Sequence, residues 1–178
     1  MLERDDAVLV VIDVQDKLAR GMVEREALLD NVGKLVRGAD VLGLPVILTE
    51  QYPEGLGPTL PDVAELIDAR PIPKRAFSCS GEPAFVEALE AAGRRQVLLC
   101  GIEAHVCVYQ TARDLVESGY QAHVVIDAVS SRTDSNRRAG IQKAMDVGAE
   151  RTTVEMALFE MLGAAEGDAF KRIISIVK

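Results

Sequence analysis

A carboxylate, an amine and a thiol, groups that can share one acyl-transfer reaction, each follow an apolar run in this sequence. Asp13 and Lys74 come directly after two such runs, and Cys107 lies six positions beyond Gly101, which ends another. Because the carboxyl ends of parallel strands share one edge of a sheet, we expect the three side chains to meet there. A thiol activated by an acid and an amine can act as a nucleophile.

The three cysteines differ in their surroundings. Cys100 lies inside an apolar run and is expected to pack in the core, as free cysteines often do. Cys79 lies in a polar turn, where its role stays open. Cys107 comes where a helical pattern begins, and the N–H groups of a helix start stabilise a thiolate. We therefore predict that Cys107 is partly ionised at neutral pH and reacts with iodoacetamide before Cys100.

Taken alone, Asp13 is a stronger candidate for a catalytic role than Lys74 or Asp127. Its neighbours are apolar, and a carboxylate in such surroundings has a partner or a task, unless it only caps a nearby loop. Lys74 is selected only by its position, since most lysines are solvated. Asp127 is expected to end the fifth strand and to accept N–H groups of a loop, which is a structural role.

Length and composition favour one domain, residues 1–178, with an aliphatic core. Apolar residues make up 48% of the chain and aromatic residues 4%, with no Trp, as in buried parallel sheets flanked by helices. The net charge of −8, with no Lys/Arg run longer than a pair, argues against nucleic-acid and anionic-membrane partners. No apolar stretch approaches the ~20 residues of a membrane span.

Metal and nucleotide sites lack support in the sequence. The two histidines, His105 and His123, have no second ligand at coordinating spacing, and His105 is two positions from Cys107, too near to face it on a helix. Neither a Gly-x-Gly-x-x-Gly nor a Gly-Lys-Ser/Thr motif is present. We expect no metal and no cofactor.

One pattern occurs four times: an amphipathic helical stretch, a glycine, then a short apolar run. The glycines are Gly43, Gly93, Gly119 and Gly148. Glycine accepts the left-handed conformation that ends a helix, and alternating helices and apolar strands are typical of βαβ units. The pattern predicts an α/β protein with a doubly wound parallel sheet.

Two segments depart from this pattern. Residues 50–61 contain three Pro and two Gly, which predicts an irregular loop that shapes the pocket. Within it, Gln51 could orient the substrate or could be a solvated loop residue. The C-terminal stretch 167–178 is rich in Ile and Val, and we read it as a subunit contact of a homo-oligomer, with a dimer as the simplest case.

Three short blocks together carry a family resemblance. They are Val-Val-Ile-Asp-Val-Gln at 10–15, Lys-Arg-Ala-Phe-Ser-Cys at 74–79 and Gly-Ile-Glu-Ala-His-Val-Cys at 101–107. In this order the chain resembles the isochorismatase-like cysteine hydrolases over residues 7–162. The resemblance implies a three-layer αβα fold with a six-stranded parallel sheet of order 3-2-1-4-5-6.

The resemblance also implies the site residues. Asp13, Lys74 and Cys107 would form a catalytic triad, and a non-proline cis peptide between Ile102 and Glu103 would turn the Glu103 N–H toward that of Cys107. These two amides would form the oxyanion hole. Ile102, like Gln51, is expected to contact the substrate.

Departures from the family pattern narrow the activity. Isochorismatases proper lack the cysteine, and nicotinamidases add a metal site built on Asp-x-His, where this chain has Thr49-Glu50-Gln51-Tyr52-Pro53. The chain looks most similar to the isochorismatase-domain-containing branch. We expect a metal-independent hydrolase of a small amide or related acyl compound, acting through a thioester.

Three alternatives to this hypothesis stay open. They are a binding or scaffold protein on the same fold, a nicotinamidase-type amidase, and a thiol switch between Cys79 and Cys107. The acidic N-terminus without a signal pattern, together with unpaired cysteines, leads us to expect a cytoplasmic protein.

Overall fold

Six strands form one parallel sheet in the order β3-β2-β1-β4-β5-β6 in a computed structural model that describes residues 1–178. This order and the α/β class confirm the expectation. The strands are β1 (Ala7–Ile12), β2 (Val46–Gln51), β3 (Ile72–Lys74), β4 (Gln96–Ile102), β5 (Gln121–Ser130) and β6 (Glu150–Thr152).

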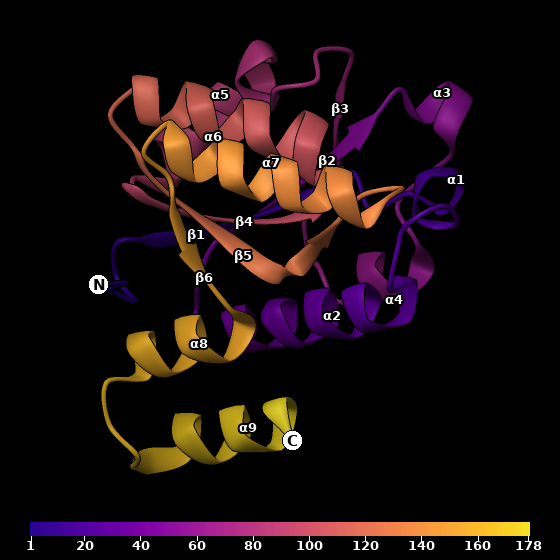
Figure 1. The fold of residues 1–178 in the computed structure, drawn as a ribbon. Coiled ribbons are helices and arrows are strands. Elements are labelled where there is room, and N and C mark those ends of the chain that lie inside the picture. The colour runs from indigo at the N-terminus through magenta and orange to yellow at the C-terminus, as the bar shows by residue number, and fades with distance from the viewer.

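Helices cover both faces of the sheet and make three layers (Figure 1). One face packs against α2 and α8, with α9 outside these two helices, and the other face packs against α5, α6 and α7 (Figure 1). The helices are α1 (Asp16–Ala19), α2 (Arg25–Leu42), α3 (Pro53–Leu56), α4 (Pro61–Ala64), α5 (Pro83–Ala92), α6 (Tyr109–Glu117), α7 (Asp134–Asp146), α8 (Val154–Leu162) and α9 (Gly167–Val177). A 3₁₀ turn, η1 (Cys79–Gly81), and a π-helical turn, η2 (Ala104–Val108), complete the chain.

The left-handed conformation predicted for the glycines after the helical stretches is confirmed. Gly43, Gly93, Gly119 and Gly148 all have positive φ. At Gly43 this left-handed residue ends α2, because its N–H closes the last turn on the Asp40 carbonyl, and the chain then turns back toward β2.

The boundaries of β5 and β6 differ from those expected from the sequence. Asp127 does not end β5, which continues to Ser130. The pairing of β5 with β4 shifts in this region, so extra residues of β5 are accommodated as a bulge. The sixth strand ends at Thr152, and Val154 begins α8.

Residues 50–61 are not an irregular loop, which corrects the prediction. Two short helices, α3 and α4, begin at Pro53 and Pro61. Proline suits the first helical position, because the N–H that it lacks would have no partner there. Proline therefore starts helical turns in this segment, although its frequency suggested an irregular loop.

The C-terminal stretch is the helix α9, which packs against α2 and α8. Ile173 is completely buried in the core, and Ile176 and Val177 pack partly against it. The most buried apolar residue of this stretch thus belongs to the protomer's own core, and the subunit contact expected for the stretch stays a prediction. None of the helices has the length and apolar character needed to cross a membrane.

Candidate active site

Asp13 follows the last residue of β1 at the centre of the sheet. Strand alternation would put its side chain with that of Val11, on the face covered by α2. The backbone at Asp13 is left-handed, with φ 53°, and its Oδ1 accepts a 2.8 Å hydrogen bond from Thr49 Oγ1. Thr49 lies two residues after Ile47, whose side chain packs on the opposite face, with α5 and α6. The backbone turn thus brings the carboxylate to that face.

Lys74 is the last residue of β3 and is only 2% exposed. Its Nζ lies 2.7 Å from Asp13 Oδ2. The ammonium also donates to Gln51 Oε1 at 2.6 Å and to the carbonyls of Ala76 and Phe77 at 3.2 and 3.0 Å. A buried charge needs such full pairing, and this arrangement provides it.

Cys107 lies in the π-helical turn η2, just before α6, and is 6% exposed. Gly101 allows β4 to come close to β1 here, because its φ is 108° and a Cβ would collide with the carbonyl oxygen of Ile12. The Cys107 Sγ is 4.0 Å from Gln51 Oε1. The structure therefore places Asp13, Lys74 and Cys107 together, as their positions in the sequence predicted.

The protonation of Cys107 differs from the prediction. Burial, and next the negative charge of Asp13, raise the pKa of the Cys107 thiol to about 12, and the opposing effect of Lys74 is smaller. Burial also raises the pKa of Asp13, against the lowering effect of Lys74. These shifts favour a protonated thiol beside a more basic carboxylate in the resting site, whereas the sequence led us to expect partial ionisation of Cys107 at neutral pH.

The Ile102–Glu103 peptide is cis, as the resemblance implied. The N–H of Glu103 makes no hydrogen bond within the chain, which is unusual for a backbone donor. The Glu103 side chain turns away to pair with Arg132 at 3.0 Å. The Glu103 amide, four residues before Cys107 in the chain, thus remains a donor without a partner in the protein.

Gln51 and Ile102 were both expected to contact the substrate. Gln51 is half-buried and contacts Lys74, so it belongs to the site. The Ile102 side chain is fully buried in the core on the face of α2, α8 and α9. A substrate beside Cys107 can meet its backbone but not its side chain.

Three further buried residues adjoin the triad. Thr49 and Gln15 are fully buried polar residues, and a polar residue within or directly after an apolar strand was the signal that could have identified both. Cys79 is fully buried in η1, 3.9 Å from Thr49 Oγ1. Burial raises the pKa of Cys79 to about 11.

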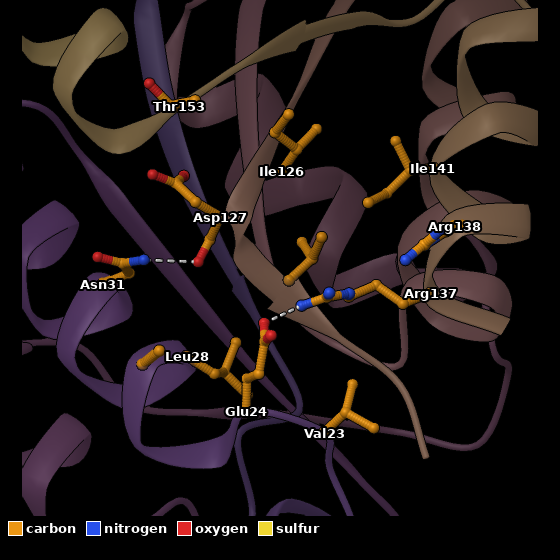
Figure 2. Close-up of a pocket in the computed structure, with 12 residues that line it drawn as sticks. Val23, Glu24, Leu28, Asn31, Ile126, Asp127, Arg137, Arg138, Ile141 and Thr153 are labelled. Atoms are coloured by element: carbon orange, nitrogen blue, oxygen red, sulfur yellow. Dashed lines mark hydrogen bonds and ion pairs between the residues drawn. The ribbon is translucent and has the colours of Figure 1, made fainter. Parts of the chain in front are cut away.

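Asp127 lies outside this cluster. Its Oδ1 accepts the N–H of Val154 at 2.9 Å, at the start of α8. Figure 2 shows Asp127 beside a hollow of about 360 Å³ that shares no residue with the triad. Two polar pairs line this hollow, Asn31 Nδ2 with the Asp127 carbonyl and Arg137 with Glu24.

Neither histidine belongs to the triad. His105 Nδ1 is 3.0 Å from Ser131 Oγ. His123 is buried near the start of β5, and burial lowers its pKa. No three His, Cys, Asp or Glu side chains are arranged to hold a metal ion.

Comparison with known proteins gave consistent matches. The family model of the isochorismatase domain matches residues 7–156. Isochorismatase domain-containing protein 2 of Pongo abelii is 37% identical over 174 residues, which are 97% of this chain and 83% of that protein.

Two solved structures share the fold over nearly their whole length. The MAR1 ribonuclease of Caenorhabditis elegans is 35% identical, with a TM-score of 0.92 over 99% of this chain and 91% of that one. The YcaC gene product of Escherichia coli, described as an octameric hydrolase of unknown specificity, is 26% identical, with a TM-score of 0.93 over 98% of this chain and 89% of its own.

Proposed function

Because the chain belongs to the isochorismatase family, we propose that it is a metal-independent hydrolase of a small amide or related acyl compound. The reaction proceeds through a thioester on Cys107. The observation that carries this proposal is the fully buried pair of Asp13 and Lys74, 2.7 Å apart, beside a thiol. A scaffold protein would have no use for two buried charges at the point where strand order reverses and α/β folds bind ligands.

In the acylation step, Asp13 takes the proton of the Cys107 thiol while Sγ forms a bond to the substrate carbonyl carbon. Asp13 suits this step because its raised pKa makes it a stronger base than an ordinary carboxylate. The carbonyl oxygen becomes an oxyanion and accepts hydrogen bonds from the amides of Glu103 and Cys107. Removing one such donor typically costs about 2.7–4 kcal/mol of barrier.

The tetrahedral intermediate then collapses, and the bond to the leaving nitrogen breaks as Asp13 returns its proton to that nitrogen. In deacylation, Asp13 removes a proton from water, and the oxygen attacks the thioester carbon. The carbon–sulfur bond breaks, and Sγ recovers a proton from Asp13 as the acid leaves. Lys74 stays charged throughout and stabilises the negative charge on Sγ and Asp13.

The name ribonuclease belongs to the nematode relative, and the charge of this chain does not favour that activity. A ribonuclease must hold phosphates, and this chain carries a net charge of −8. The Lys74 ammonium is buried and already paired with Asp13. An acyl substrate fits these groups better than a phosphodiester.

We also propose that residues 1–178 form one domain and that the protein assembles into a homo-oligomer. All six strands belong to one sheet with helices on both faces. The octameric state of the bacterial YcaC relative supports assembly. Light scattering at micromolar concentration tests this, and a monomeric mass would contradict it.

The test of the activity is intact-mass detection of acylated protein after incubation with a panel of small aliphatic and aromatic amides. A mass increase equal to the acyl group is expected in the wild type and not in Cys107→Ala. A strong chelator should leave the acylation unchanged. An adduct on Cys79 or Cys100, or dependence on added zinc, would refute the proposal, as would RNA cleavage without amide acylation.

A further inference from the structure

The end of β1 has an unusual relation to β2. The two strands pair in register up to Ile12 and Thr49, and the Asp13 N–H still donates to the Thr49 carbonyl at 3.2 Å. At Asp13 the left-handed backbone turns the chain away. Gln51, the last residue of β2, is therefore left without a backbone partner from β1.

The side chain of Gln15 takes the place of that missing strand. Its Oε1 accepts the Gln51 N–H at 2.8 Å, and its Nε2 donates to the Gln51 carbonyl at 3.0 Å. The same Nε2 also donates to the Gly57 carbonyl, after α3. Gln15 is fully buried, and since these bonds all go to backbone groups, the amide extends the sheet by one pairing.

This pairing determines where the Gln51 side chain points. Gln51 Nε2 donates to the Arg75 carbonyl at 3.0 Å, which leaves Oε1 to accept the Lys74 ammonium at 2.6 Å. On its other side, the backbone of Gln51 pairs with Lys74 in the β2–β3 register. A displaced Gln51 would deprive the Lys74 ammonium of its shortest neutral acceptor.

We propose that Gln15 is a positioning residue that controls the reactivity of Cys107, by holding Gln51 so that the Lys74 ammonium stays paired with Asp13 and with the Gln51 Oε1 that the thiol approaches. This inference rests on the proposed function, because it assigns Lys74 the task of stabilising charge on Sγ. Gln15 itself touches neither substrate nor thiol. Its effect travels through two hydrogen-bonded residues, Gln51 and Lys74.

The experiment measures the rate of Cys107 alkylation by iodoacetamide as a function of pH, by peptide mass spectrometry. In this reaction Sγ bonds to the methylene carbon, iodide leaves, and the thiol proton passes to solvent. Gln15→Met keeps the length of the side chain and removes its three hydrogen bonds. We expect the rising limb of the pH profile, measured between pH 7 and 10, to move to higher pH, and a displacement by one pH unit lowers the rate at pH 8 about tenfold.

Gln142→Met is the matched control, because Gln142 is exposed on α7 and its amide bonds only Asp146. Its profile should match the wild type. If Gln15→Met does not fold, Gln51→Met removes the same contact to Lys74 from a half-buried position and should displace the rising limb by the same amount. A folded Gln15→Met or Gln51→Met with the wild-type profile would overturn the inference, since a purely structural role changes stability and does not move this limb to higher pH.

The outcome separates this inference from the proposed function. A profile displaced to higher pH in a protein that no amide acylates supports Gln15 as a positioning residue and refutes the hydrolase. Acylation of the wild type together with an unchanged profile in the variants supports the hydrolase and refutes the role of Gln15.

Discussion

Asp13 and Asp127 are two carboxylates near the carboxyl ends of strands in the same sheet, one at its centre and one toward its rim. Asp13 is fully buried between β2 and β4 and pairs with the buried ammonium of Lys74. Asp127 is exposed and bonds the N–H of Val154. Loss of surrounding water, complete at Asp13 and partial at Asp127, raises the pKa of both carboxyls, but only Asp13 has a thiol beside it.

The difference follows from how many strands surround each residue. β1 has neighbours on both sides from Leu9 to Ile12, the end that leads into Asp13, whereas β6 pairs with β5 only from His123 to Val125. Beyond that point the rim is open, and Figure 2 shows its polar groups pairing across a hollow. At the centre of the sheet, the surrounding layers exclude water, and the charged groups there interact strongly with one another and with the thiol. At the rim, charged groups stay solvated and have structural roles.

The contrast between Asp13 and Asp127 would be wrong if the two carboxylates contributed equally to activity. Asp13→Asn should lower acylation of Cys107 by about 10²- to 10⁴-fold, because it removes the general base. Asp127→Asn should leave the rate within about twofold, since it touches no reacting atom. Rates of acyl-enzyme formation by intact mass are the measurement, and comparable losses in both variants would disprove the assignment.

A second test compares the central ion pair with the rim pair. Lys74→Met should destabilise the protein by about 3–5 kcal/mol, because the buried carboxylate of Asp13 is left without its cation. Arg137→Met, which removes the half-exposed partner of Glu24, should cost about 0–1 kcal/mol.

Urea unfolding followed by circular dichroism measures both values. The double variant Asp13→Asn/Lys74→Met should recover part of the stability lost in Lys74→Met, because no unpaired charge then remains. Equal costs for the central and the rim pair would show that burial does not distinguish them.

The pH dependence of Cys107 alkylation in the wild type tests the protonation state of the thiol at the central site. With a pKa near 12, the thiolate fraction grows with pH across the whole neutral and alkaline range. Iodoacetamide labelling should therefore keep accelerating up to at least pH 10, with Cys107 ahead of Cys100, which is fully buried and whose pKa burial alone raises further. A plateau near pH 8 would show that the thiol is ionised at neutrality.

The smallest expected effect concerns stability at the rim. Asp127→Ala removes the acceptor of the Val154 N–H at the start of α8, and loss of such a bond costs about 1 kcal/mol. A change of the urea midpoint at an unchanged slope would confirm it. Asn31→Ala, which removes the bond to the Asp127 carbonyl, should have a smaller effect, and a larger one would contradict the role given to Asp127.

Much of the fold could be predicted because its signals are local. Helix periodicity, the glycine at Gly43 and the apolar strand before Asp13 each depend on residues close in sequence, and the family resemblance supplied the strand order. Predictions failed where distant contacts decide, as at the boundaries near Asp127, which depend on a bulge opposite β4. The packing of Ile173 in the C-terminal stretch against the core likewise depends on α2 and α8.

The sequence alone determined which groups can react, because a strand end places Asp13, Lys74 and the segment of Cys107 at one edge whatever the side-chain details. Only the tertiary structure decided how they react. The pKa of Cys107 depends on how much water the surrounding layers exclude and on the charge of Asp13, which comes from another strand. The pairing of Gln15 with Gln51 likewise depends on a backbone turn at Asp13, and no local pattern encodes a hydrogen bond between residues 36 positions apart.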